Sequence, residues 1–212
     1  MGHTTRNIVF DFGAVLFTWQ PRVLIATYFS AYAGTSEQAA VLANAVFGHA
    51  DWHDFDRGVL SARTVSERTA VRLDLPEPAL RDLIDGIAQH LQPMPDTLTI
   101  LAQLRTLRTQ RPDRLQLFFL SNMPEPYARV LEQKHPFLGW FDGGIFSGDV
   151  HHIKPEPEIY ELLEARYALV PADTIFIDDL AGNVVSAQAR GWQGIHFESA
   201  AQLQAQLMPL LA

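Results

Sequence analysis

The sequence predicts an α/β protein, with a Rossmann-like parallel sheet core that is interrupted after its first strand by an inserted helical cap. Short apolar runs alternate with amphipathic helical patterns over most of the chain, which is typical of βαβ units. Residues 18–92 break this alternation, because they hold helical patterns but no convincing strand. We therefore expect an α/β core of residues 1–17 and 93–212 and a helical cap of residues 18–92.

Five apolar runs have the length and composition of buried strands. The expected strands are residues 8–11, 115–120, 144–147, 174–178 and 194–197. Helical patterns separate the later runs, so these strands should be parallel and covered by helices on both faces of the sheet. The expected core helices are residues 96–110, 125–135, 156–168 and 182–190.

The expected cap contains two segments with clear helix start signals. The segment "SEQAAVLANAVF" is helical in pattern, with Ser36 as the expected N-cap, and "SARTVSERTAVRL" has Ser61 in the same role. The stretch "QPMP" at residues 92–95 marks the end of the cap, because proline resists continuation of a helix.

Composition limits the classes of function. The chain has 212 residues, enough for a substantial core, and its net charge of -8 argues against a nucleic-acid partner. Cysteine is absent, which excludes disulfides and thiolate metal sites. No apolar run approaches the ~20 residues that span a bilayer, and the N-terminus lacks a signal-peptide pattern. We expect a cytoplasmic monomer or homodimer with no membrane partner.

Polar side chains follow the expected strands at the points where the strands end. Parallel sheets bind their ligands at this edge, so these side chains should lie close together. Each has an ordinary alternative role, since an aspartate or serine after a strand often forms a turn or caps a helix. The residues are Asp11, Ser121, Asn122, Asp178 and Asp179, with Lys154 beyond the third strand.

The order of these residues resembles the haloacid dehalogenase superfamily. Its four motifs correspond to "VFDFGAV", "FLSN", "IKPEPEIY" and "IFIDDLAGN", and the helical segment lies where many members carry a cap. Within the superfamily, "FDRGVLS" and "KPEPEIY" resemble a group that contains an α-D-glucose-1-phosphate phosphatase and the N-terminal phosphatase domain of soluble epoxide hydrolase. The resemblance covers nearly the whole chain.

The resemblance implies a phosphatase that works through an aspartyl-phosphate intermediate. Asp11 would be the nucleophile, with Ser121 and Lys154 as the other catalytic residues. A carboxylate can attack a phosphate dianion only if cations neutralise the repulsion, and Mg²⁺ prefers hard oxygen ligands. The implied metal ligands are Asp11, the Gly13 carbonyl, Asp178 and Asp179, and the implied substrate-binding residues are Ser121, Asn122, Lys154 and Trp19.

Gly13 departs from the pattern of most phosphatases in this superfamily. They carry a second aspartate at this position, which protonates the leaving oxygen and later activates water. Such general acid–base help contributes about 10²–10⁴-fold to a rate. Its loss puts mutase chemistry in doubt, favours good leaving groups, and leaves the source of the proton open.

Three classes of function fit the motifs. The first is a magnesium-dependent phosphatase acting on a small phosphorylated metabolite, such as a sugar phosphate. The second is a 2-haloacid dehalogenase-type hydrolase, which the acidic pair in "IDDLAGN" disfavours because displacement of halide needs no metal. The third is a catalytically weak regulatory domain that retains the fold.

Smaller features remain to be placed in the fold. Asn183 could cap a helix or bond to the acidic loop, two roles that the sequence favours about equally. The adjacent His151 and His152 should point to opposite faces of an extended segment and so should not share a metal. In the cap, we expect most aromatic side chains to form core, but Trp19 and Trp52 to face the substrate cavity.

Overall fold

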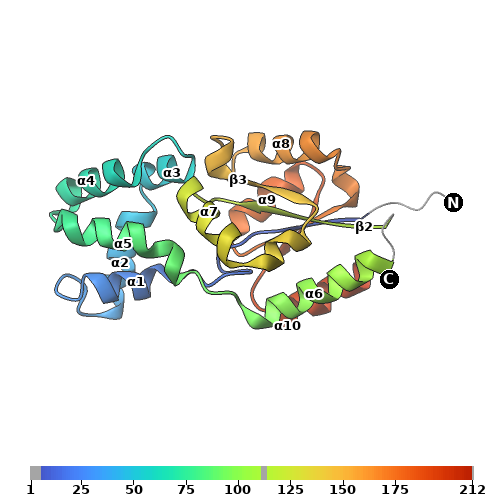
Figure 1. The fold of residues 1–212 in the computed structure, drawn as a ribbon, viewed down its shortest axis with the longest axis horizontal. Coiled ribbons are helices and arrows are strands. Elements are labelled where there is room, and N and C mark those ends of the chain that lie inside the picture. The colour runs from blue at the N-terminus through green and yellow to red at the C-terminus, as the bar shows by residue number, and fades with distance from the viewer. Residues whose placement is uncertain (1–5, 111–113, 212) are drawn as a thin grey trace.

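The computed structural model describes residues 6–110 and 114–211, and its described strands form one parallel sheet (Figure 1). The strands are β1 (Arg6–Phe10), β2 (Leu115–Ser121), β3 (Gly143–Phe146), β4 (Thr174–Asp178) and β5 (Gln193–His196). Their order across the sheet is β3-β2-β1-β4-β5, so β1 lies between β2 and β4 at its centre. The predicted α/β fold with a parallel sheet is confirmed.

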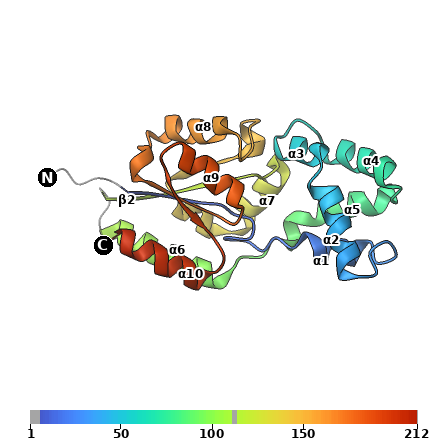
Figure 2. The ribbon, with the colours of Figure 1, turned by 180° about the vertical axis from the view of Figure 1, so that it is seen from behind.

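Helices cover both faces of this sheet (Figures 1 and 2). Successive side chains of a strand point to opposite faces, so Ile8 and Phe10 of β1 join one hydrophobic cluster, whereas Val9 joins the other. The first cluster includes residues of α6 (Pro95–Gln110), α7 (Glu125–Lys134) and α10 (Ala200–Leu207). The second includes residues of α8 (Pro157–Tyr167) and α9 (Ala181–Ala189). Burial on both faces explains why the strands are continuous apolar runs.

Residues 18–92, which we call the helical insertion, lie at the end of the sheet toward which β1 runs (Figure 2). All of these residues are described, and they contain helices and no strand. The helices are α1 (Pro21–Tyr28), α2 (Ser36–Phe47), α3 (Ala50–Asp56), α4 (Ala62–Leu73) and α5 (Glu77–His90).

The chain enters and leaves the insertion through two neighbouring segments. The Thr18 amide donates to the Gln92 carbonyl at 2.8 Å, and the Met94 amide donates to the Leu16 carbonyl at 2.8 Å. These bonds pair the segments where the sequence places its boundaries. The division at 17/18 and 92/93 stays a prediction, and so does the role of the insertion as a cap.

Of the two N-caps predicted in the insertion, one is confirmed and one is wrong. Ser61 caps α4 as expected, since its hydroxyl accepts from the Thr64 amide. Ser36 does not cap α2, because Thr35 forms a capping box in which Thr35 and Gln38 each accept from the other's amide. This motif needs the hydroxyl three residues before the glutamine, and that residue is Thr35.

The observed elements differ from the expected ones mainly at their ends. β1 ends at Phe10, so Asp11 is the first residue after it, and β2 extends to Ser121. The sequence analysis named no helix at α1, α3, α5 or α10. Residues 1–5, 111–113 and 212 of the expected core lie outside the described residues. Within the described ranges, every helix is too short or too polar to span a bilayer.

Candidate active site

The three central strands bring the predicted site residues to one edge of the sheet. Because β1 is paired with β2 on one side and β4 on the other, Asp11 lies between Ser121 and Asp178, the last residues of its neighbours. In sequence these residues are far apart, and the parallel register alone places them together. Lys154 reaches the same edge from the segment between β3 and α8.

Lys154 joins the carboxyl groups of two strands. Its Nζ atom lies 2.7 Å from Asp11 Oδ1 and 2.7 Å from Asp178 Oδ2, and it donates to the Leu120 carbonyl at 2.8 Å. The side chain is 1% exposed, so burial lowers its pKa, but the two carboxylates raise it more and the net shift is upward. Lys154 is therefore a charged ammonium at neutral pH.

Opposing effects act on the pKa of Asp11. Burial raises its pKa to about 7; Lys154 opposes the rise, and the nearby carboxyl groups of Asp178 and Asp179 add to it. The Phe12 amide donates to Asp11 Oδ1 at 2.7 Å, the same oxygen that contacts Lys154. A single ammonium thus faces three carboxyl groups, and further positive charge would stabilise the ionised form of Asp11.

Asp178 and Asp179 have different environments. Asp178 is fully buried, and Oδ1 accepts from the Leu180 amide and from Asn183 Nδ2, which also reaches Oδ2. Asn183 therefore bonds to the acidic loop, one of the two roles that the sequence left open. Asp179 lies on the wall of a cavity, and burial, followed by repulsion from Asp178, raises its pKa to about 6.

The donor set fits a magnesium ion. One oxygen from each of Asp11, Asp178 and Asp179 lies within 4.8 Å of the others, and Mg²⁺ prefers carboxylate oxygens. Both oxygens of Asp178 already accept hydrogen bonds, so Asp179 is the member of the pair more available to an ion. Gly13 also lines the cavity, where a backbone carbonyl could complete the set.

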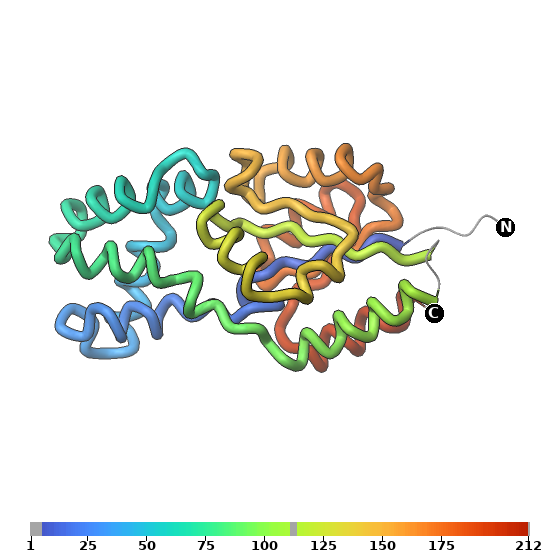
Figure 3. The backbone as a smooth tube through the Cα atoms, viewed as in Figure 1, coloured from blue at the N-terminus to red at the C-terminus, as the bar shows by residue number. Residues whose placement is uncertain are grey.

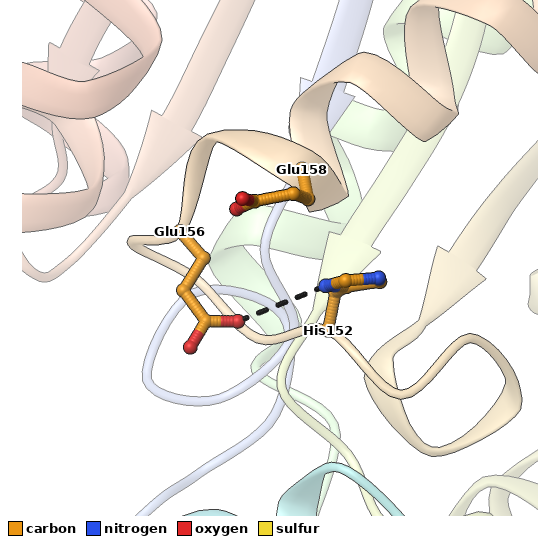
Figure 4. A group of neighbouring side chains, drawn as sticks. All are labelled: His152, Glu156 and Glu158. Carbon is orange, nitrogen blue, oxygen red and sulfur yellow. Dashed lines mark ion pairs between the residues drawn. The ribbon is translucent and has the colours of Figure 1, made fainter.

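A second group of metal-capable side chains lies nearby (Figure 4). His152, Glu156 and Glu158 come within 4.8 Å of one another, and His152 Nδ1 lies 4.0 Å from Glu156. Glu156 also pairs with Arg57 and accepts from the Ile153 amide, so its oxygens hold the loop to the insertion. His151 instead contacts the Arg57 carbonyl through Nδ1. The two histidines thus have separate partners, but His151 has a φ of +62° and lies in a turn, not in the extended segment that the sequence predicted.

The two polar residues after β2 have distinct surroundings. Ser121 is buried at the cavity wall, where its hydroxyl can face a bound phosphate. Asn122 holds the backbone of Lys154 from both sides, since Nδ2 donates to the Lys154 carbonyl at 2.9 Å and Oδ1 accepts from its amide at 2.7 Å. The Asn122 side chain therefore positions Lys154, a role that sequence reasoning did not assign.

These residues form the floor of a cavity of about 500 Å³ between the sheet edge and the insertion. Trp19 and Trp52, which the sequence predicted to face it, both line it. Aromatic rings continue from Trp19 through Phe47 to Trp52, with centroids 5.2 Å and 4.7 Å apart. The apolar part of the wall includes Trp19, Phe47, Trp52, Ile87, Leu91 and Tyr127.

Asp56, Arg57 and Tyr127 are among the cavity residues to which the sequence assigned no role. Asp56 and Arg57 lie in "FDRGVLS", a motif that indicated the subgroup but gave no role for either side chain. Tyr127 lies in an ordinary helical pattern that carries no signal for a cavity residue. The Tyr127 hydroxyl donates to the Ile84 carbonyl at 2.6 Å and so joins α7 to the insertion.

Comparison with known families agrees with the geometry. The family model for haloacid dehalogenase-like hydrolases matches residues 7–191, which include every predicted site residue. The chain belongs to the haloacid dehalogenase-like hydrolases. The superfamily expected from the motifs is thereby confirmed, whereas the expected subgroup stays a prediction.

Curated and structural relatives of this hydrolase cover most of the chain. It is 26% identical to a sesquiterpene phosphatase of Aspergillus oryzae, over 91% of this chain and 90% of the relative. It is 21% identical to a phosphorylated carbohydrates phosphatase of Thermotoga maritima, over 89% and 83%. A haloacid dehalogenase family enzyme of Bacteroides thetaiotaomicron, in complex with magnesium and inorganic phosphate, has the same fold, with a TM-score of 0.69, 17% identity and coverage of 92% and 94%.

Proposed function

We propose that the protein is a magnesium-dependent phosphatase that cleaves a small phosphate monoester through an aspartyl-phosphate intermediate. The observation that carries the proposal is the contact of Lys154 with both Asp11 and Asp178 on the floor of a cavity whose wall includes Asp179. This arrangement has too much negative charge for a phosphate dianion unless a cation joins it. The names of the two curated phosphatase relatives support the reaction class.

The side chains divide the work of the reaction. Lys154 and the Phe12 amide both hold Asp11 Oδ1, so Oδ2 is the oxygen free to attack phosphorus. Ser121 and Lys154 would bind the phosphate oxygens, and Asn122 keeps Lys154 in place. When bound, Mg²⁺ would neutralise charge on the phosphate and on Asp11. Its ligands would be Asp11, Asp179 and the Gly13 carbonyl, and Asp178 would contribute through a water molecule or through its charge.

The same geometry disfavours the dehalogenase alternative. A carboxylate that displaces halide from carbon meets no phosphate dianion and needs no added cation. Here Asp179 adds a third carboxyl group whose ionisation the environment opposes, as its pKa of about 6 indicates. Such a group has no use in halide displacement but is suited to binding Mg²⁺.

The cavity favours an apolar leaving group over a sugar. The aromatic rings of Trp19, Phe47 and Trp52 and the side chains of Ile87 and Leu91 offer area for apolar contact and few hydrogen-bond partners. Where a polyhydroxylated ring lay against these apolar side chains, its hydroxyls would stay unpaired. The sesquiterpene phosphatase relative agrees with this preference, so we propose isoprenoid or aryl monophosphates in place of the sugar phosphate expected from sequence.

Phosphate release tests the proposal. The wild type is assayed with 4-nitrophenyl phosphate, farnesyl monophosphate, glucose 1-phosphate and 2-chloropropionate, each with Mg²⁺ and with EDTA. We expect phosphate from the first two, faster for farnesyl monophosphate than for the sugar phosphate, and no turnover in EDTA. Full turnover in chelator would contradict the metal role, release of chloride would favour the dehalogenase, and no product from any compound would favour a regulatory domain.

A further inference from the structure

Asp56 brings a further carboxyl group to the cavity, and it comes from the insertion. It is the last residue of α3, and its side chain lines the same cavity as Asp11, Gly13 and Asp179. The mechanism described above does not use it. Asp11 comes from the sheet edge and Asp56 from the insertion, so the two carboxyl groups reach the same cavity from different parts of the fold.

The backbone of Asp56 is fastened to the core. The Ser147 hydroxyl donates to the Asp56 carbonyl, and His151 Nδ1 lies 2.8 Å from the carbonyl of Arg57. The Arg57 guanidinium pairs with Glu156 on the core. Three core partners hold these two residues of the insertion, so the turn that carries the Asp56 carboxyl group has a defined place relative to the core.

The turn that carries Asp56 allows close approach only because it contains glycine. Gly58 has a φ of +74°, which L side chains rarely adopt, and a Cβ atom there would lie 2.7 Å from the Gly148 carbonyl oxygen. The backbones of the insertion and the core therefore meet at "DRG". This packing places the turn that carries Asp56 against the core, where Asp56 is half-buried.

The environment keeps Asp56 protonated at neutral pH. Burial raises its pKa to about 8, although the charges of Arg57 and Lys154 oppose the rise. A carboxyl group with this pKa can donate a proton near pH 7 and take it back later, which is the property that a general acid–base residue needs. Besides Arg57 and Lys154, the titratable groups that line the cavity with it are His53 of α3, Tyr127 of α7, and the carboxyl groups of Asp11, Glu156 and Asp179 on the core.

Gly13 leaves this role vacant at the usual position. A Cβ atom added to Gly13 would meet Trp19 Cβ at 3.7 Å, which is ordinary contact, and the backbone there is not in the left-handed region. A side chain at residue 13 is therefore not excluded by space, and the absence of an acid there is a chemical difference. The structure offers another acid in the same cavity, on the insertion.

We infer that Asp56 is the general acid–base residue of this enzyme, acting from the insertion in place of the acid missing at Gly13. The inference rests on the proposed phosphatase function. As Asp11 forms its bond to phosphorus, the bond between phosphorus and the leaving oxygen breaks, and that oxygen takes the Asp56 proton and departs as the alcohol. Water then attacks the aspartyl phosphate and gives a proton to the Asp56 carboxylate, which releases phosphate and restores both aspartates.

A comparison of two leaving groups tests the inference. Asp56→Asn is assayed with 4-nitrophenyl phosphate, whose leaving group needs no proton, and with farnesyl monophosphate, whose alkoxide does. We expect a loss of about 10²–10⁴-fold on the alkyl ester and less than about 10-fold on the aryl ester. Asp54→Asn is the matched control, because Asp54 lies on the same helix, pairs with Arg57 and does not line the cavity; it should lose little on either ester.

The pH profile and a rescue variant distinguish a proton-transfer role of Asp56 from a purely structural role. For the alkyl ester, kcat/KM of the wild type should fall as the pH rises through about 8, because Asp56 loses its proton, and this limb should be absent in Asp56→Asn. The double variant Asp56→Asn/Gly13→Asp should recover at least about 10-fold of the alkyl-ester rate. A merely structural Asp56 would give neither result.

A measurement that does not depend on turnover shows whether Asp56 is protonated, even if Asp56→Asn loses activity for another reason. Difference infrared spectroscopy between wild type and Asp56→Asn should show the band of a protonated carboxyl group at pH 7 that disappears by pH 10. Equal losses on both esters, or an Asp56 that is ionised at pH 7, overturns the inference. A wild type that hydrolyses neither ester overturns the proposed function, a result that can be distinguished from failure of the Asp56 assignment.

Discussion

At the scale of single residues, the charge on Asp11 decides what the site can do. Its carboxyl group is buried beside Lys154, which contacts it at 2.7 Å, and yet its pKa lies near 7 because burial and the other carboxyl groups outweigh that contact. A lysine alone does not make this aspartate a strong nucleophile. The remaining stabilisation has to come with a cation, which links the nucleophile to metal binding.

Asp11→Asn should remove turnover without unfolding the protein. The amide keeps the volume of the side chain but cannot form the intermediate, so we expect a loss of roughly 10⁴-fold or more in kcat on 4-nitrophenyl phosphate. Circular dichroism should show an unchanged fold. More than a few per cent of the wild-type rate in a folded Asp11→Asn preparation would mean that another residue attacks phosphorus.

Asp56 should also give a pH-dependent contribution to stability. Its pKa is about 8 in the folded protein against 3.8 as the ordinary value, so the folded state binds the proton more tightly. Stability from this group is then fully present below about pH 4 and is lost as the pH rises through about 8.

Asp56→Asn should therefore be more stable than the wild type at pH 9, by roughly 1–2 kcal/mol after allowance for the partial exposure of the side chain to the cavity. The difference should shrink at pH 5. Thermal unfolding of wild type, Asp56→Asn and Asp54→Asn at the two pH values measures it. An equal gain at both pH values would show that ionisation of Asp56 is not its source.

At the scale of elements, two loops act together although they follow different strands. The segment after β2 holds the segment before α8, because the Asn122 amide makes two hydrogen bonds to the Lys154 backbone. Lys154 in turn bridges Asp11 after β1 and Asp178 at the end of β4. The loops at four strand positions are thus one connected unit.

Asn122→Ala should lower kcat by roughly 10–100-fold with little change in KM, since Lys154 would lose its fixed position while the cavity wall stays intact. The lost hydrogen bonds should cost about 1–3 kcal/mol of folding free energy. Asn44→Ala, at an exposed position of α2, is the control. A rise in KM alone would instead assign Asn122 to substrate contact.

The aromatic wall should decide which leaving groups bind. Trp19→Ala removes a ring that packs on Phe47 at a centroid distance of 5.2 Å and lines the cavity. We expect KM for farnesyl monophosphate to rise about 10-fold, with little change for methyl phosphate, which reaches only the floor. Trp140→Ala, outside the cavity, serves as control. Equal effects on both esters would argue against an apolar subsite at Trp19.

At the scale of the whole molecule, the site is completed by two parts of the chain. The sheet supplies the nucleophile, Lys154 and the acidic pair, and the insertion supplies Trp19, Asp56 and most of the apolar wall. Polar contacts at "DRG" and the Tyr127 bond to Ile84 hold the parts together on the far side of the paired segments at 17/18 and 92/93. Binding on the floor is therefore coupled to the position of the insertion.

Magnesium should stabilise the folded protein by mass action. At 100 times its dissociation constant an ion contributes about 2.7 kcal/mol, which differential scanning fluorimetry detects as a higher melting temperature. Asp179→Asn should abolish the shift, whereas Glu158→Gln, in the second acidic group of Figure 4, should keep it. Loss of the shift in Glu158→Gln alone would place the ion at His152, Glu156 and Glu158.

The sequence by itself determined the sheet, the helical insertion and the family, because these depend on local patterns. Apolar runs fix strands that are buried on both faces, and polar residues at the strand ends fix the chemistry of that edge, as with Asp11, Ser121 and Asp178. The error at Ser36 had a local cause as well, since the capping box at Thr35 is readable in the sequence.

Only the tertiary structure decided the partners of those residues. Asn122, which the sequence predicted as a substrate ligand, also holds Lys154, 32 residues away. Both oxygens of Asp178 accept hydrogen bonds, whereas Asp179 lines the cavity. Asp56 had no signal of its own, because a carboxyl group acquires a raised pKa only from what buries it. The turn that carries Asp56 contacts Ser147 and Gly148, some 90 residues on in the chain, and no local pattern records such contacts.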